Sequence, residues 1–117
     1  MVMDQDTLKE RCKALTLRVM SLIDHLPRSV QGRVIADQIM RSASSVAANY
    51  RAACRARSKA EFVAKLSIVV EEADETVLWL ELIRDGGLLP SNRIMDLLAE
   101  ANEITAIMVA SRKTASS

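Results

Sequence analysis

Apolar residues recur at spacings of three and four in four separate stretches of this 117-residue chain. On an α-helix of about 3.6 residues per turn, such residues line one face, which must be hidden from water. Four faces of this kind hide one another in a four-helix bundle, so the sequence predicts an all-α fold. The striped positions are Leu8, Cys12, Leu15, Val19, Leu22 and Leu26; Ile35, Ile39, Ser42, Val46, Tyr50 and Ala53; Phe62, Leu66, Val69, Ala73, Thr76, Leu80 and Ile83; and Ile94, Leu97, Ala101, Ile104 and Met108.

Helix start and stop signals divide the chain into these four elements. Pro27 ends the first helix, because the residue before a proline disfavours the helical region. Ser58 and Glu61 form a capping box at the start of the third helix, and Gly86 follows its last turn. The predicted helices are about 5–26, 33–56, 58–84 and 91–112, in a single domain 1–117. Similar lengths with short connections favour an up-down-up-down bundle with left-handed, heptad-type packing.

The composition suits a folded chain outside the membrane. Half of the residues are hydrophobic and only 3% are aromatic, so the core is aliphatic. The sequence contains no run of about 18 apolar residues, so we expect no transmembrane helix. The charged N-terminus lacks the apolar core of a secretion signal. Cys12 and Cys54 lie outside any Cys-x-x-Cys or Cys/His cluster, which is typical of a reduced protein. We therefore expect a cytoplasmic protein with no membrane partner.

The helices carry more apolar residues than one bundle needs to cover its own core. A lone bundle uses about three of every seven positions on each helix. Ile68, Trp79 and Leu82 lie outside the main stripe, on one flank of the third predicted helix. We predict that these three residues form a homo-oligomer interface. The alternative is that they are scattered surface apolar residues, which are normal in soluble proteins.

The net charge of +1 conceals a separation of charge along the chain. Residues 38–60 contain five basic residues and no acidic one, whereas residues 61–86 contain seven acidic residues and two basic ones. Such blocks indicate pairing between neighbouring helices or a directed external field. Part of the basic block gathers at the predicted corner between the second and third helices, where it could bind nucleic-acid phosphates; the alternative is a solvated corner. These candidate contacts are Arg51, Arg55, Arg57 and Lys59.

No constellation of residues predicts catalysis. The acidic run 71–75 resembles part of a di-iron site, but such a site needs Glu-x-x-His motifs on two helices. The single histidine, His25, has Leu22 three residues before it. Glycine-rich phosphate loops are absent, and the serines at 42, 44 and 45 have no accompanying base. We expect no catalytic, cofactor-binding or metal-binding residues, no cofactor and no small-molecule substrate.

Two acidic residues of the third helix share a face with apolar ones. Glu72 and Glu75 are three residues apart and lie on the side of Ile68 and Trp79. A carboxylate on a half-apolar face needs a partner. We predict that Glu72 or Glu75 pairs with an arginine, within the chain or across an interface. Arg41, with Glu72 and Glu75, would then hold the second and third helices together.

Three motifs in order give the chain a family resemblance. They are Gln-x-x-Arg at 38–41, Ala-Asn-Tyr-Arg at 48–51 and Glu-Ala-x-Glu-Thr at 72–76. Together with the segments 58–66 and 79–81, they resemble bacterial four-helix-bundle proteins first noticed in intervening sequences of large-subunit ribosomal RNA genes. That family includes relatives of the accessory variability protein of diversity-generating retroelements. The resemblance covers roughly residues 8–112.

The resemblance implies an up-down four-helix bundle that assembles as a homopentamer, with no established activity for most members. The accessory variability relatives form a basic barrel that binds a reverse transcriptase and nucleic acid. The residues that match the family pattern, which we interpret as structural or assembly residues, are Arg41, Asn49, Arg51, Glu72 and Glu75.

We expect a non-enzymatic, oligomeric bundle that acts as a scaffold associated with RNA or DNA. The alternative is a protein-interaction module that recruits a partner protein without nucleic acid, through Ile68, Trp79 and Leu82.

Overall fold

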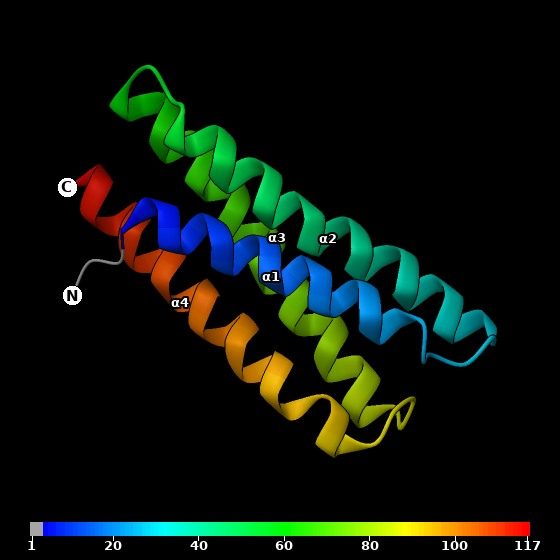
Figure 1. The fold of residues 1–117 in the computed structure, drawn as a ribbon. Coiled ribbons are helices and arrows are strands. Elements are labelled where there is room, and N and C mark those ends of the chain that lie inside the picture. The colour runs from blue at the N-terminus through cyan, green and yellow to red at the C-terminus, as the bar shows by residue number, and fades with distance from the viewer. Residues whose placement is uncertain (1–3) are drawn as a thin grey trace.

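Four long helices that alternate in direction make up the computed structural model, which describes residues 4–117 (Figure 1). They are α1 (Gln5–Ile23), α2 (Val30–Cys54), α3 (Lys59–Asp85) and α4 (Met95–Ser116), and a short 3₁₀ turn, η1 (Ser91–Arg93), precedes α4. The prediction of an all-α four-helix bundle is confirmed. The first three residues of the predicted domain 1–117 lie outside the described residues.

The helix boundaries follow from local hydrogen bonds. The carboxylate of Asp4 accepts a hydrogen bond from the backbone N–H of Asp6 (3.0 Å), and the hydroxyl oxygen of Ser29 accepts one from that of Gly32 (3.0 Å). The predicted start of α2 at residue 33 was therefore late. At the start of α3, the hydroxyl oxygen of Ser58 accepts a hydrogen bond from the N–H of Glu61 (3.1 Å), as the capping box predicted.

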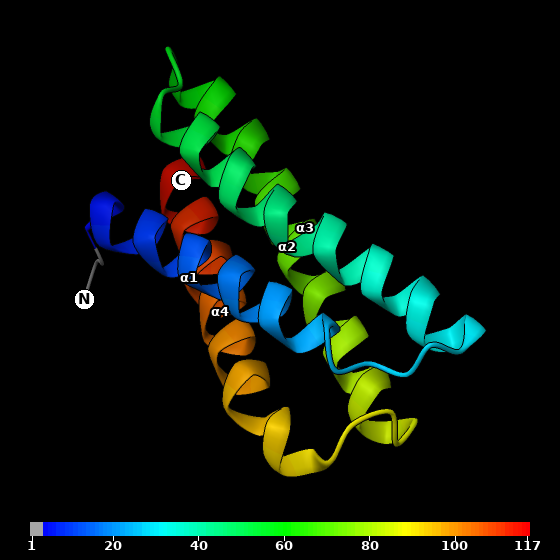
Figure 2. The same ribbon diagram turned by 45° about the vertical axis from the view of Figure 1, so that its right-hand side comes forward.

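The helices pack in the cyclic order α1, α2, α3, α4, so each contacts two neighbours. Figures 1 and 2 both show α2 and α3 side by side along most of their length. The bundle is elongated, with extents of 44 × 25 × 20 Å. Every residue of the four sequence stripes is buried except Ile35 and Phe62, which are partly buried. The stripes therefore identified the core.

One polar contact lies inside the interface between α2 and α3. The hydroxyl of Thr76 donates a hydrogen bond to the hydroxyl oxygen of Ser42 (2.8 Å), and Ser42 donates to the carbonyl oxygen of Ile39 (3.2 Å). Both side chains are almost completely buried. This contact explains why a serine and a threonine occupy positions in apolar stripes: each buried hydroxyl has a partner.

Candidate functional site

The four cations predicted to contact nucleic acid lie at the corner between α2 and α3. Arg51 is in the last turn of α2, Arg55 caps that helix, Arg57 is in the connection and Lys59 begins α3. All four residues are exposed. Within residues 4–117, none of their side chains forms an ion pair with a carboxylate side chain. The ammonium group of Lys59 donates a hydrogen bond to the backbone oxygen of Ser117 (3.1 Å). Most of this positive charge is therefore available to an external partner.

A groove between α1 and α2 extends the positive charge along the bundle. Its volume is about 380 Å³, and no acidic residue lines it. Small side chains of α2 line one side, and apolar and basic side chains of α1 line the other. The lining residues are Lys9, Lys13, Thr16, Leu17, Ser44, Ala47, Ala48 and Arg51. We call this surface the α1–α2 groove.

Of the residues that line this groove, only Arg51 was predicted from the sequence as a candidate contact. The small side chains of α2 let α1 approach closely, and the hydroxyl of Thr16 donates a hydrogen bond to the carbonyl oxygen of Ala43 (3.0 Å). Ser44, Ala47 and Ala48, however, remain open at the edge of that contact. Lys9 and Lys13 join them from α1 only because the bundle places α1 beside α2.

Arg41 does not join α2 to α3 as predicted. Its Nε donates to a carboxylate oxygen of Asp37 (3.0 Å), one turn earlier on the same helix, and both side chains are largely exposed. Among the described residues, no ion pair links Arg41 to Glu72 or Glu75. The reason is local, since an acid four residues before an arginine lies within direct reach on a helix. Pairing of Glu72 or Glu75 across an interface remains a prediction.

Two polar groups of α3 have no described partner. Burial, followed by repulsion from Glu75 and Glu71, raises the pKa of the partly buried Glu72 carboxyl above its ordinary value. The indole N–H of Trp79 is buried and has no hydrogen-bond acceptor among the described residues. Burying such a polar group lowers the stability of the fold unless a hydrogen-bond or ion-pair partner contacts it.

The outer face of α3 is partly apolar and partly acidic. Ile68, Glu75 and Leu82 follow one another at intervals of seven residues, with Glu71 and Leu78 beside them, and all five are exposed. We call this surface the α3 ridge. Of the three residues predicted as an oligomer interface, Ile68 and Leu82 lie on the ridge, and Trp79 lies partly buried at its edge.

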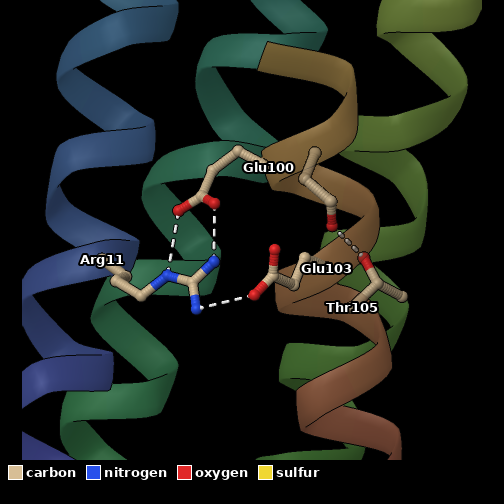
Figure 3. Close-up of polar contacts among 5 residues, drawn as sticks. Arg11, Glu100, Glu103 and Thr105 are labelled. Atoms are coloured by element: carbon tan, nitrogen blue, oxygen red, sulfur yellow. Dashed lines mark hydrogen bonds and ion pairs between the residues drawn. The ribbon is translucent and has the colours of Figure 1, made fainter. Parts of the chain in front are cut away.

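An ion-pair cluster that the sequence analysis missed connects α1 to α4 (Figure 3). The guanidinium group of Arg11 donates from Nε and Nη2 to the two carboxylate oxygens of Glu100 (3.0 and 2.6 Å), and from Nη1 to Glu103 (3.2 Å). These partners are 89 and 92 residues away along the chain, so no local pattern could have indicated them. In Figure 3 the hydroxyl of Thr105 donates to the carbonyl oxygen of Ala101 (2.7 Å) on α4 itself.

Neither a metal-binding cluster nor an activated thiol at Cys12 is found among the described residues. Residues 4–117 contain no group of three His, Cys, Asp or Glu side chains placed to hold a metal ion. Burial raises the pKa of the Cys12 thiol to about 12, so this thiol stays protonated and unreactive at neutral pH. No helix in the described part of the chain combines the length and apolar character needed to cross a membrane.

Comparisons with known proteins agree with the fold. The family model of the 23S rRNA-intervening sequence protein matches residues 5–110. A crystal structure of a protein with unknown function, from the S23 ribosomal protein family of Bacteroides thetaiotaomicron, is 30% identical in sequence, with a TM-score of 0.85. The match covers 95% of this chain and 99% of that chain. No curated protein matches this sequence.

Proposed function

Because the chain belongs to the 23S rRNA-intervening sequence protein family, we propose that it is a non-enzymatic, self-associating bundle that serves as a scaffold for RNA or DNA. The assembly is a homopentamer, as the family resemblance noted above implies. The α2–α3 corner binds phosphate groups, and self-association presents one corner from each subunit.

One observation carries the nucleic-acid part of this proposal: Arg51, Arg55, Arg57 and Lys59 are exposed together, and none of them pairs with an acidic side chain among residues 4–117. Cations of this kind bind nucleic acids by displacing the counterions of the phosphates. Four charges make a weak site on their own. Several corners held in one assembly bind one strand far more tightly, because each later contact is intramolecular.

Fluorescence anisotropy with fluorescein-labelled double-stranded RNA and single-stranded DNA tests this proposal. We expect binding at about 50 mM salt that weakens steeply towards about 200 mM. Replacing Arg55→Gln together with Arg57→Gln lowers the affinity by about tenfold or more and reduces the slope of log affinity against log salt by about two.

The matched control replaces two arginines at the other end of the bundle, Arg28→Gln and Arg33→Gln, which are exposed and give the same change of charge. This control keeps more affinity than the corner variant. The absence of binding at low salt, or an equal loss in both variants, contradicts the phosphate-binding role of the corner.

A second candidate function is recruitment of a partner protein through α3. Ile68 and Leu82 are 38% and 42% exposed, and the buried N–H of Trp79 has no described acceptor. A partner that covers this face forms a complex that tolerates high salt and does not depend on nucleic acid. Persistence of the complex after nuclease treatment and a high-salt wash, together with its loss on Leu82→Lys, favours this alternative.

A further inference from the structure

Two surfaces of this chain complement each other in charge. The α1–α2 groove carries Lys9, Lys13 and Arg51 and no acidic lining residue. The α3 ridge carries Glu71 and Glu75, with Glu72 at its edge. Among residues 4–117, neither Lys13 nor Arg51 forms an ion pair with a carboxylate side chain, and neither do these three glutamates with a cation. Lys9 already pairs with Asp6 on its own helix (3.2 Å). Lys13 and Arg51 in the groove, and the glutamates of the ridge, therefore lack a counter-charge that the other surface holds.

The two surfaces also match in shape and in apolar character. The ridge is a convex helix face on which Ile68, Leu78 and Leu82 are 38%, 45% and 42% exposed. The groove is a hollow whose α2 side consists of one serine and two alanines, followed by Arg51. At the small residues another helix can approach the backbone of α2 closely. Leu17, in the groove lining, is 54% exposed and offers an apolar contact.

We propose that the α3 ridge of one copy docks in the α1–α2 groove of a second copy. This inference rests on the self-association proposed above and deepens it by naming the two faces that meet. Ridge leucines and Ile68 cover the small residues and Leu17 of the groove. The carboxylates of Glu71, Glu72 and Glu75 face the cations at the rim of the groove, Arg51 among them. Arg55, Arg57 and Lys59 of the corner stay open to phosphate groups in this arrangement.

Like-with-like contacts between copies are disfavoured. A ridge packed against a second ridge brings two sets of glutamates together, and a groove packed against a groove does the same with lysines and arginine; both arrangements cost free energy. A contact between two different faces is heterologous, and each copy then offers a free ridge and a free groove. The groove lies on the α1–α2 side of the bundle, and α3 is the next helix round the bundle after α2. Heterologous contacts of this kind close into a ring when the rotation between successive copies closes.

The test uses two variants that each disable one face. Ala48→Glu places a carboxylate and extra bulk in the groove, and Leu82→Lys places a cation on the ridge. Both positions are exposed, so the fold is retained, which circular dichroism checks. Light scattering after gel filtration at micromolar concentration should show an assembly of several subunits for the natural sequence and a single subunit for each variant. The two variants mixed should associate again, since the intact ridge of Ala48→Glu fits the intact groove of Leu82→Lys.

Matched controls make the same substitutions on α4. Ala99→Glu changes another exposed alanine, and Val109→Lys changes an apolar residue that is 40% exposed, against 42% for Leu82. Both controls should assemble like the natural sequence. Glu75→Lys is a second ridge variant, which should dissociate the assembly through charge alone.

The outcomes separate the two proposals. If the natural sequence is a single subunit at micromolar concentration, self-association itself is wrong and the docking proposal is wrong with it. If the natural sequence assembles and either single variant still assembles, only the docking of ridge in groove is wrong. Failure of the mixture to associate also overturns the docking proposal, because the mixture contains both an intact ridge and an intact groove.

Discussion

Arg11 on α1 and Glu100 on α4 form a bidentate ion pair, with both carboxylate oxygens accepting hydrogen bonds from one guanidinium group (Figure 3). The two side chains are 20% and 24% exposed. The planar guanidinium group donates two parallel hydrogen bonds to the planar carboxylate group. These hydrogen bonds raise the pKa of Arg11 further above its ordinary value. The pair holds together the first and last helices, which are joined by no direct connection.

The first prediction concerns the strength of this pair. A double-mutant cycle with Arg11→Gln and Glu100→Gln, followed by urea unfolding, should give a coupling free energy of about 1–2 kcal/mol. The control cycle uses Arg41 and Asp37, whose side chains are 75% and 60% exposed. Its coupling should be about 0.5 kcal/mol or less, because solvent screens exposed pairs. Equal coupling in the two cycles would contradict this account.

The elements of this fold were predictable from the sequence because each depends on near neighbours. The apolar stripes and the capping box at Ser58 required only spacings of three and four residues. The start of α2 was misplaced because the cap residue Ser29 is followed by Gly32 and not by a glutamate or glutamine three residues on. A serine without that partner in a Pro-Arg-Ser loop resembles an ordinary turn.

The surfaces were harder to predict, since they depend on which helices become neighbours and how each is rotated. The sequence around Lys13 does not indicate that this residue lines a groove with Ala48. The sequence around Glu100 likewise does not indicate that Glu100 pairs with Arg11. The pair between Asp37 and Arg41 is different, because its spacing of four residues was visible in the sequence.

The second prediction concerns the close contact between α2 and α3. Ser42→Leu should lower the free energy of unfolding by about 2–3 kcal/mol, because Ser42 is 1% exposed and a larger side chain has no space. Ser42→Ala should cost about 0.5 kcal/mol or less. Without the Ser42 hydroxyl, the single hydroxyl proton of Thr76 is donated to the carbonyl oxygen of Glu72, which lies 2.9 Å away. The matched control is Ser21→Leu at an exposed position of α1, which should change stability by less than about 0.5 kcal/mol.

The third prediction compares two glycines by thermal unfolding. Gly87 has φ = 67° and open space around its missing Cβ, so Gly87→Ala should cost about 1 kcal/mol from backbone strain alone. Gly87→Asn should cost less, because asparagine tolerates this conformation better. At Gly32 an added Cβ would overlap the carbonyl oxygen of Pro27. Gly32→Ala should therefore cost more, about 2–3 kcal/mol. A smaller loss at Gly32 than at Gly87 would show that the loop before α2 shifts easily.

The fourth prediction concerns the pH dependence contributed by Glu72. Its pKa in the folded chain is raised above the ordinary value of 4.5, chiefly by burial and then by Glu75 and Glu71. A raised carboxyl pKa means that folding disfavours the ionised form. The free energy of unfolding is therefore unaffected by Glu72 below the ordinary pKa, where the carboxyl is protonated in both states. It falls as the pH rises from the ordinary pKa through the raised pKa of the folded chain. At neutral pH the charge of Glu72 therefore destabilises an isolated subunit.

Glu72→Gln should raise the free energy of unfolding of the isolated subunit at pH 7 by about 0.5 kcal/mol. The Ala48→Glu background keeps the measurement on single subunits. The difference in stability between chains with and without the Glu72→Gln substitution should shrink towards zero as the pH falls below 4.5, the ordinary glutamate value. The control Asp74→Asn removes an exposed carboxylate from the same helix and should change stability by less than about 0.5 kcal/mol at either pH. A loss of stability in Glu72→Gln at pH 7 would instead reveal a cationic partner of Glu72 within the subunit.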